Sequence, residues 1–169
     1  MIYLDSSCIV KLIIAEDESE ALHALLVDEG TPSTFTSQLA VTEVKRALHA
    51  QGETELAASV AALPGHLQVP GQTILARPAT GDMFSAAGDL LPGSALRSLD
   101  AVHLATARAA GAALTAVVTY DTRMAAAARD VGLTVLAPQR LPDAATPDEA
   151  TPPRFSDGGR KTPFAVDGG

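Results

Sequence analysis

The chain begins with the short apolar run IYL at residues 2–4, which is followed directly by Asp5 and two serines. A similar arrangement returns later in the chain, where AVVT at residues 116–119 precedes Asp121. Short, continuous apolar runs are typical of strands that are buried on both faces of a parallel sheet. In open sheets of this kind, functional groups collect at the carboxyl ends of the strands. Both stretches therefore predict an α/β fold with acidic side chains at one edge of its sheet.

Strand and helix signals alternate through residues 1–141. Further strands are predicted at residues 34–36, 72–76 and 133–136. A short helix is predicted after Ser6, and longer helices at residues 18–29, 37–50, 53–63, 81–91, 98–110 and 122–131. This alternation implies a mainly parallel central sheet flanked by helices on both faces, which is a three-layer α/β fold.

The composition changes at residue 142. Residues 142–169 contain five Pro and four Gly in 28 positions and show no apolar period. Such a segment cannot bury enough apolar surface to offset the entropy of ordering it. We therefore expect one folded domain at residues 1–141 and a disordered tail at residues 142–169.

The bulk composition excludes several classes of protein. A net charge of −8 argues against broad, non-specific binding of nucleic acid, and 4% aromatic residues with no Trp leave little for stacking on bases. The single cysteine, Cys8, predicts neither a disulfide nor a zinc site and fits the reducing cytoplasm. No apolar run approaches the roughly 18 residues of a membrane span, so no membrane association is expected.

Four acidic residues stand where the chain is predicted to reach one edge of the sheet. Asp5 and Asp121 follow strands, Asp100 lies in the first turn of a helix, and Glu43 lies in the second turn of another. Four converging carboxylates repel one another unless a cation neutralises them. Oxygen ligands of this kind suit Mg²⁺ or Mn²⁺. A cluster of this type is a common means of hydrolysing a phosphodiester, with a metal-activated water as the nucleophile.

Each of these residues also has a purely structural interpretation. Asp5 could cap the first helix, Asp100 could complement a helix dipole, and Asp121 could be an ordinary turn residue. Glu43 falls on the apolar side of its helix, where a carboxylate is costly unless it is paired, and Arg46 at i+3 could be its partner. The four together are harder to explain in this way than any one of them alone.

Other polar residues near the acids are candidates for supporting roles. His103 lies one turn after Asp100 and could be a general base or a metal ligand, but an orienting or core histidine is favoured, since oxygen-rich Mg²⁺ sites seldom include imidazole. The hydroxyls of Ser6 and Thr119 could bind metal-held water or serve as a cap and a strand residue. Cations that could hold backbone phosphates, or be only solvated surface, are Lys11, Arg46, Arg97 and Arg123.

The motifs resemble those of PIN-domain proteins, and more narrowly of VapC-type toxins from bacterial toxin–antitoxin pairs. The similarity spans about residues 1–138. It rests on YLDSS at 3–7, Glu43, LRSLDAVHLA at 96–105, and VTYDTRM at 118–124 followed by Gly132 and Leu133. The proline- and glycine-rich tail is not part of the family pattern.

The resemblance implies a PIN-like fold and a Mg²⁺- or Mn²⁺-dependent endoribonuclease. It matches Asp5, Glu43, Asp100 and Asp121 to the acidic metal-site residues, and Ser6 to a small hydroxyl residue beside the first acid. It further implies an RNA substrate of the tRNA or ribosomal RNA class, silencing by a VapB-type antitoxin, and a homodimer or a toxin–antitoxin hetero-oligomer.

Two other functions fit parts of the same pattern. One is a PIN-like scaffold that binds RNA or a protein partner without turnover, although an inert scaffold has no use for four mutually repelling acids. The other is a phosphatase with Asp5 as its nucleophile. That chemistry wants a second acid two residues further on, where this chain has Ser7.

Overall fold

The computed structural model describes residues 1–27, 33–70 and 72–139. Its strands are β1 (Ile2–Leu4), β2 (Thr34–Ser37), β3 (Ala61–Leu63), β4 (His66–Val69), β5 (Gln72–Arg77), β6 (Ala116–Val118) and β7 (Val135–Leu136). Its helices are α1 (Ser6–Ile13), α2 (Ser19–Val27), α3 (Leu39–Ala50), α4 (Thr54–Ser59), α5 (Gly81–Gly88), α6 (Ser98–Arg108), the 3₁₀ turn η1 (Gly111–Ala113) and α7 (Thr122–Asp130). The predicted boundary at residue 141 and the predicted tail at 142–169 lie outside the described residues.

The strands of the described residues form one sheet in the order β3-β4-β5-β2-β1-β6-β7. The five strands from β5 to β7 pair in parallel, and β3 and β4 add an antiparallel hairpin at the β5 edge. The central β1 pairs with β2 on one side and with β6 on the other. These pairings confirm the mainly parallel α/β sheet that the sequence predicts.

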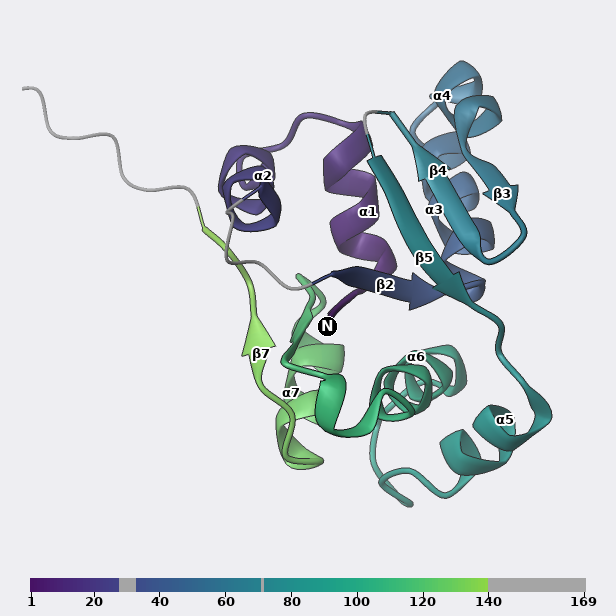
Figure 1. The fold of residues 1–169 in the computed structure, drawn as a ribbon, viewed down its shortest axis with the longest axis vertical. Helices are drawn as coiled ribbons and strands as arrows, with labels where there is room; N and C mark the ends of the chain where they lie inside the picture. The colour runs from purple at the N-terminus through teal and green to yellow at the C-terminus, as the bar shows by residue number, and fades with distance from the viewer. Residues whose placement is uncertain (28–32, 71, 140–169) are drawn as a thin grey trace, which may run out of the picture.

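Helices cover both faces of the sheet. Figure 1 shows α1 to α4 gathered on one side of the strands and α5 to α7 on the other. Side chains alternate along β1: Ile2 and Leu4 pack into a cluster with residues of α1, α3 and α4, whereas Tyr3 packs with residues of α6 and α7. The ring of Tyr3 meets that of Phe35 edge to face, with their centroids 5.2 Å apart. Burial on both faces explains why β1 has no polar position until Asp5.

The helix predicted at residues 53–63 is wrong in its second half. Only Thr54–Ser59 is helical, and Ala61–Leu63 is strand β3, paired antiparallel with β4. Gly65 takes a φ of +75° in the two-residue turn between these strands, so Pro64-Gly65 joins a hairpin and does not end a helix. The run of small apolar residues favours neither state strongly, and pairing with the sheet edge decides it.

The remaining boundaries differ from prediction by smaller amounts. Helix α5 ends at Gly88, before the Leu91 that the sequence predicts as its end. Strand β7 is only Val135–Leu136. Helix α2 is described from Ser19 to Val27, and the end predicted at residue 29 lies outside the described residues. In the described part of the chain, no helix has the length and apolar character needed to cross a membrane.

Candidate active site

All four acidic residues singled out in the sequence line one pocket of about 550 Å³. Asp5 follows β1 and is the N-cap residue of α1, while Asp121 lies beyond β6 at the N-cap of α7. Asp100 lies in the first turn of α6, and Glu43 lies in the second turn of α3. The pocket therefore sits where the parallel strands end and the crossover helices begin, which is the usual place for a site in this type of sheet.

Asp5 is held by hydroxyl groups. It is only 5% exposed, and its Oδ2 accepts hydrogen bonds from Ser7 Oγ at 2.8 Å and from Thr119 Oγ1 at 2.9 Å. The same two hydroxyls accept the backbone N–H groups of Tyr120 and Asp121. Although Asp5 occupies the N-cap position of α1, its side chain makes no capping hydrogen bond. The network instead ties its carboxylate to the loop that follows β6.

Asp121 does have a structural role. Its Oδ1 accepts the backbone N–H groups of Arg123 at 2.8 Å and Met124 at 2.9 Å, which caps α7. The structural interpretation of Asp121 as an ordinary turn residue is therefore replaced by a specific role as the N-cap of α7. Because both bonds end on one oxygen and the residue also lines the pocket, capping and ligand binding are compatible at Asp121.

Asp100 is the electrostatically strained member of the set. Its Oδ2 is buried and has no hydrogen-bond partner among the described residues. Burial raises the pKa of Asp100, and the charges of Asp121 and Asp5 raise it further, against a smaller lowering by Arg97. A buried carboxylate oxygen without a donor, facing like charges, is the arrangement that a cation relieves.

Glu43 pairs with His103 and not with Arg46, the partner considered at i+3. His103 Nε2 lies 2.7 Å from Glu43 Oε2, and the side chain of Arg46 is an exposed part of the pocket wall. Burial alone would raise the pKa of Glu43, but the hydrogen bond and charge of His103, with a smaller contribution from Ser6, lower it. Burial alone would lower the pKa of His103, but Glu43, Asp5 and Asp100 raise it. A lowered pKa for Glu43 and a raised pKa for His103 both favour the charged form of this pair.

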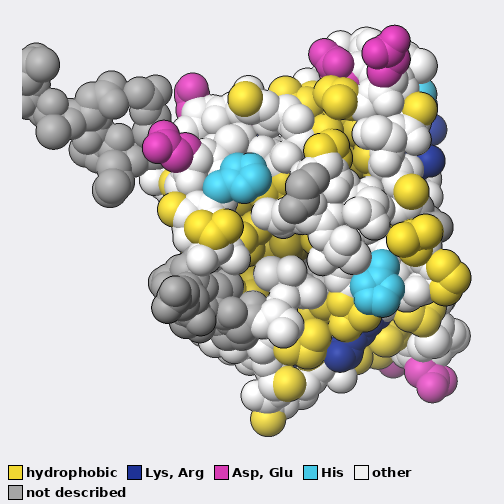
Figure 2. Space-filling view, turned by 45° about the horizontal axis from the view of Figure 1, so that its top comes forward, with side chains coloured by type: hydrophobic (Ala, Val, Ile, Leu, Met, Phe, Trp, Pro, Cys, Tyr) yellow, Lys and Arg dark blue, Asp and Glu magenta, His cyan; other side chains and the backbone are white. Residues whose placement is uncertain are grey.

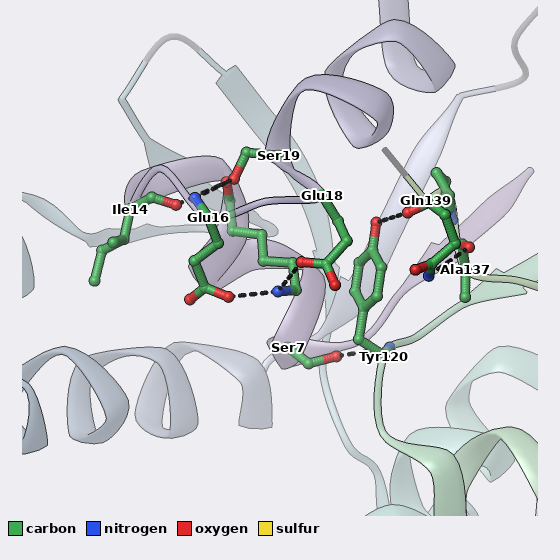
Figure 3. Close-up of polar contacts among 10 residues, drawn as sticks. Ser7, Ile14, Glu16, Glu18, Ser19, Tyr120, Ala137 and Gln139 are labelled. Atoms are coloured by element: carbon green, nitrogen blue, oxygen red, sulfur yellow. Dashed lines mark hydrogen bonds and ion pairs between the residues drawn. The ribbon is translucent and has the colours of Figure 1, made fainter. Parts of the chain in front are cut away.

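The predicted cations separate into two groups. Arg46 and Arg97 line the acidic pocket. Arg123 is exposed and is not among the lining residues, although its backbone N–H binds Asp121. Lys11 forms ion pairs with Glu16 and Glu18, and its ammonium lies 4.8 Å from the centre of the Tyr120 ring. Figure 3 shows these two glutamates around one ammonium group.

The wider surface is consistent with the low basic content of the sequence. On the face shown in Figure 2, Lys and Arg side chains are few, and hydrophobic side chains lie between uncharged ones. A broad basic face for nucleic acid is therefore not seen among the described residues of this view.

The PIN domain family model matches residues 2–130 of this chain. The chain belongs to the PIN-domain family. Within that family it is a VapC-type ribonuclease. Ribonuclease VapC46 of Mycobacterium tuberculosis is 44% identical over 137 residues, covering 81% of this chain and 97% of that protein. Ribonuclease VapC35 of the same organism is 41% identical over 142 residues, covering 82% of this chain and 97% of that protein.

A solved structure has the same fold as this PIN domain. It is Mycobacterium tuberculosis VapC20, described as a toxin that cleaves the sarcin-ricin loop, with a TM-score of 0.60 and 18% identity. The match covers 82% of this chain and all of that one. At this identity the likeness shows the fold. VapC toxins in general act on RNA and pair with VapB antitoxins, and PIN-domain nucleases of this type in general depend on divalent metal ions.

The donor set of this PIN-domain pocket suits a divalent ion that prefers oxygen. All four acids supply carboxylate oxygens, and Asp100 Oδ2 is a buried acceptor to which no group in the described part of the chain donates. Within the described ranges, no three His, Cys, Asp or Glu side chains lie close enough together to hold a metal ion as they are placed. The four carboxylates share a pocket without closing on one point.

One residue of this VapC-type site is not predicted from the sequence. It is Ser7, whose hydroxyl donates to Asp5; a serine two positions after the acid is the signal that the sequence offers for it. Ser6, the predicted hydroxyl, lines the pocket and interacts with Glu43. Arg46 was considered as a partner of Glu43 or a contact for phosphate, and it stands in the pocket wall.

Proposed function

We propose that this VapC-type chain is a divalent-metal-dependent endoribonuclease toxin whose active site is the acidic pocket. The observation that carries the proposal is that four carboxylates from four separate segments line one pocket, where a buried Asp100 oxygen has no partner among the described residues. Folding such a pocket costs electrostatic free energy, since burial and neighbouring charges disfavour the ionised form of Asp100. A site that is costly in the metal-free protein is expected where function requires it.

In this proposal Asp5, Asp100 and Asp121 bind Mg²⁺ or Mn²⁺ directly or through water, and Glu43 completes the cluster. When bound, the ion lowers the pKa of water and offsets the negative charge of the phosphate. The chain's own residues set the geometry: the hydroxyls of Ser7 and Thr119 fix the Asp5 carboxylate.

Arg46 and Arg97 are the cations available to the substrate in this pocket. Both are exposed, and both line it beside the acids. A guanidinium binds phosphate oxygens through two parallel hydrogen bonds, which orients the backbone as well as attracting it. We assign them to the phosphates that flank the scissile bond.

The substrate we propose is an unpaired segment or loop of RNA, of the tRNA or ribosomal RNA class. Unpaired segments can be drawn into a small pocket, whereas a duplex holds its backbone in a fixed helix. Attack by water in line with the leaving 3′-oxygen gives a 5′-phosphate and a 3′-hydroxyl. We further propose that the toxin works in the cytoplasm, that a VapB-type antitoxin silences it, and that it assembles as a homodimer or a toxin–antitoxin hetero-oligomer.

The two competing functions are less well supported. An Asp5-nucleophile phosphatase needs an acid at the position of Ser7, and here the Ser7 hydroxyl donates to Asp5 Oδ2. A non-catalytic scaffold does not account for the buried Asp100 oxygen, which has no partner in the part of the chain that the structure describes. The relatives that match most of the chain carry the name ribonuclease, which also favours an enzyme.

The proposal is tested with purified protein and a labelled single-stranded RNA, with Mg²⁺, with Mn²⁺ and with EDTA. We expect cleavage only with metal, products that end in 5′-phosphate, and a loss of about 100-fold or more in Asp5→Asn and Asp100→Asn, because residues that act as one unit do not contribute additively. Asp130→Asn makes the same chemical change at an exposed site and should keep full activity. Cleavage that survives EDTA, or products with a 2′,3′-cyclic phosphate, would overturn the mechanism.

A further inference from the structure

A buried chain of three side chains runs from the centre of the sheet to the acidic pocket. The hydroxyl of Tyr3, on β1, lies 2.5 Å from Nδ1 of His103, on α6. Nε2 of the same ring lies 2.7 Å from Oε2 of Glu43, on α3. Tyr3 is fully buried and His103 is 1% exposed, whereas the Glu43 side chain is 26% exposed and lines the pocket. Exposure to solvent therefore increases along these three side chains, from the core to the pocket.

These three hydrogen-bonded side chains join elements from opposite faces of the sheet. Tyr3 packs on the side of α6 and α7, while the core residues of α3 pack with Ile2 and Leu4 on the other side. His103 therefore reaches around the carboxyl edge of the sheet to a helix of the other layer. Its hydrogen bond sets the position of Glu43 relative to β1, the strand that Asp5 follows.

Both ring nitrogens of His103 are used, so its orientation is fixed. An ionised carboxylate only accepts hydrogen bonds, which requires Nε2 to carry a proton and donate it to Glu43. A phenol hydroxyl both donates and accepts, so Tyr3 can pair with Nδ1 whether or not that nitrogen is protonated. A flipped ring would lose both contacts in an interior where neither nitrogen could turn to water.

This geometry also argues against a direct role for His103 in the chemistry. A general base or a metal ligand needs a free nitrogen that faces the substrate or the ion. Neither nitrogen is free here, and the ring is almost completely buried. The expectation of an orienting or core histidine agrees with the contacts seen.

We infer that Tyr3 and His103 are positioning residues, which hold the Glu43 carboxylate in the acidic pocket in one orientation. The inference rests on the proposed function, because it gives Glu43 a place in the metal cluster. Glutamate has three side-chain torsions, and an unrestrained Glu43 would lose rotamer entropy each time it engaged an ion. Outer partners that orient carboxylate ligands typically change metal affinity or activity by about 10- to 100-fold when they are removed.

The test uses the two tyrosines of the chain, Tyr3 and Tyr120, as a matched pair. Tyr3→Phe removes one hydroxyl from His103 and keeps the ring, whereas Tyr120→Phe removes a hydroxyl that donates to the Pro138 carbonyl. We expect Tyr3→Phe to lower kcat and Mn²⁺ affinity about 10-fold with little change in KM for RNA. Tyr120→Phe should keep all three values. Equal values for Tyr3→Phe and wild type would overturn the inference.

A double-mutant cycle separates positioning from a general loosening of the fold. Glu43→Gln should reduce cleavage strongly, and in that background Tyr3→Phe should have no further effect, since it acts through Glu43. If Tyr3 had a merely structural role, Tyr3→Phe would reduce the cleavage rate by the same factor in both backgrounds. That result would refute the inference and leave the proposed function intact. Full activity in Glu43→Gln would refute the place of Glu43 in the cluster, and the inference with it.

A measurement without metal or RNA completes the test. The ¹⁵N signals of the His103 ring in the metal-free protein should shift in Tyr3→Phe at Nδ1 and stay in place in Tyr120→Phe. If Tyr3→Phe lowers the folded fraction, His103→Gln replaces it in the cycle. The amide of the new glutamine can still donate to Glu43, so His103→Gln should keep more Mn²⁺ affinity than His103→Leu. Equal affinities in these two variants would contradict positioning through that hydrogen bond.

Discussion

Thr119 Oγ1 donates a hydrogen bond to Oδ2 of Asp5 over 2.9 Å, although 114 positions separate the two residues in the sequence. Both are buried, at 1% and 5% exposure. The same hydroxyl accepts the backbone N–H of Asp121 at 3.1 Å. One threonine thus sets the relative positions of two acids at the ends of neighbouring parallel strands.

Thr119→Val should weaken both the fold and the activity. The two side chains have the same shape, so the change removes the hydroxyl and leaves Asp5 and the Asp121 N–H without that partner. We expect a loss of about 1–3 kcal/mol in the free energy of unfolding and of about 10-fold in RNA cleavage, measured by denaturant unfolding and initial rates. Thr134→Val, at an exposed site, should change neither. Wild-type stability in Thr119→Val would show that the hydrogen bond contributes nothing.

Asp100→Asn should stabilise the metal-free protein at neutral pH while abolishing activity. Because the pKa of Asp100 is raised on folding, the folded state binds its proton more tightly than the unfolded state. Stability from this group is therefore complete below the unfolded pKa and is lost as the pH rises through the folded pKa. At neutral pH the ionised side chain is a cost, which Asn removes. The melting temperature of the variant in EDTA should exceed that of wild type, and the difference should shrink toward about pH 4.

Divalent metal should reverse the order of the two melting temperatures, so that the wild type becomes more stable than Asp100→Asn. An ion that binds only the native state stabilises it by about 2.7 kcal/mol at 100 times its dissociation constant. Mg²⁺ or Mn²⁺ should therefore raise the melting temperature of the wild type, and Asp100→Asn should show a much smaller increase. Thermal melts of both proteins across a metal titration measure this. An equal response in the two proteins would remove Asp100 from the metal site.

Substitutions at Asp121 should separate its two roles. Asn is as good an N-cap as Asp, so Asp121→Asn should keep the stability of α7 and lose most of the cleavage activity, because the charge is gone. Asp121→Ala should lose the activity and also about 1 kcal/mol of stability, since the N–H groups of Arg123 and Met124 then lack their acceptor. An active Asp121→Asn would mean that the residue is only a cap.

Arg46→Gln and Arg97→Gln should weaken RNA binding more than they slow the bound reaction. Each loss of one phosphate contact should raise KM several-fold and reduce the slope of log affinity against log salt by about 0.7 for single-stranded RNA. Arg108→Gln, an exposed arginine on α6 outside the acidic pocket, is the control. If all three variants bind RNA equally well across salt concentrations, the pocket arginines do not contact the substrate.

The elements that carry the acids could be predicted because their signals are local. Ile2–Leu4 and Ala116–Val118 are uninterrupted apolar runs that end at a polar residue, and both are strands. Helix α6 begins at Ser98 as predicted, which places Asp100 in its first turn. Burial pattern and helix starts depend on residues within one or two turns of each other, so a single sequence contains them.

The hairpin of β3 and β4 could not be predicted in the same way. Ala61–Leu63 has no alternation of polar and apolar residues, and its state depends on β5 offering an edge to β4. Strand propensity is a weak local preference that packing and pairing override. Pro64-Gly65 is a turn signal, but it joins two strands of a hairpin and does not end the helix predicted at residues 53–63.

The amino-acid sequence by itself determined that acidic residues stand at the ends of particular strands and the starts of particular helices. It therefore also determined that these acids lie at one edge of the sheet. Only the tertiary structure decided the partners of those acids: Ser7 and Thr119 for Asp5, and His103 for Glu43. Glu43 and His103 are 60 positions apart, and His103 and Tyr3 are 100 apart. A hydrogen bond forms between side chains that the fold brings within about 3 Å, and separation along the chain holds no information about that distance.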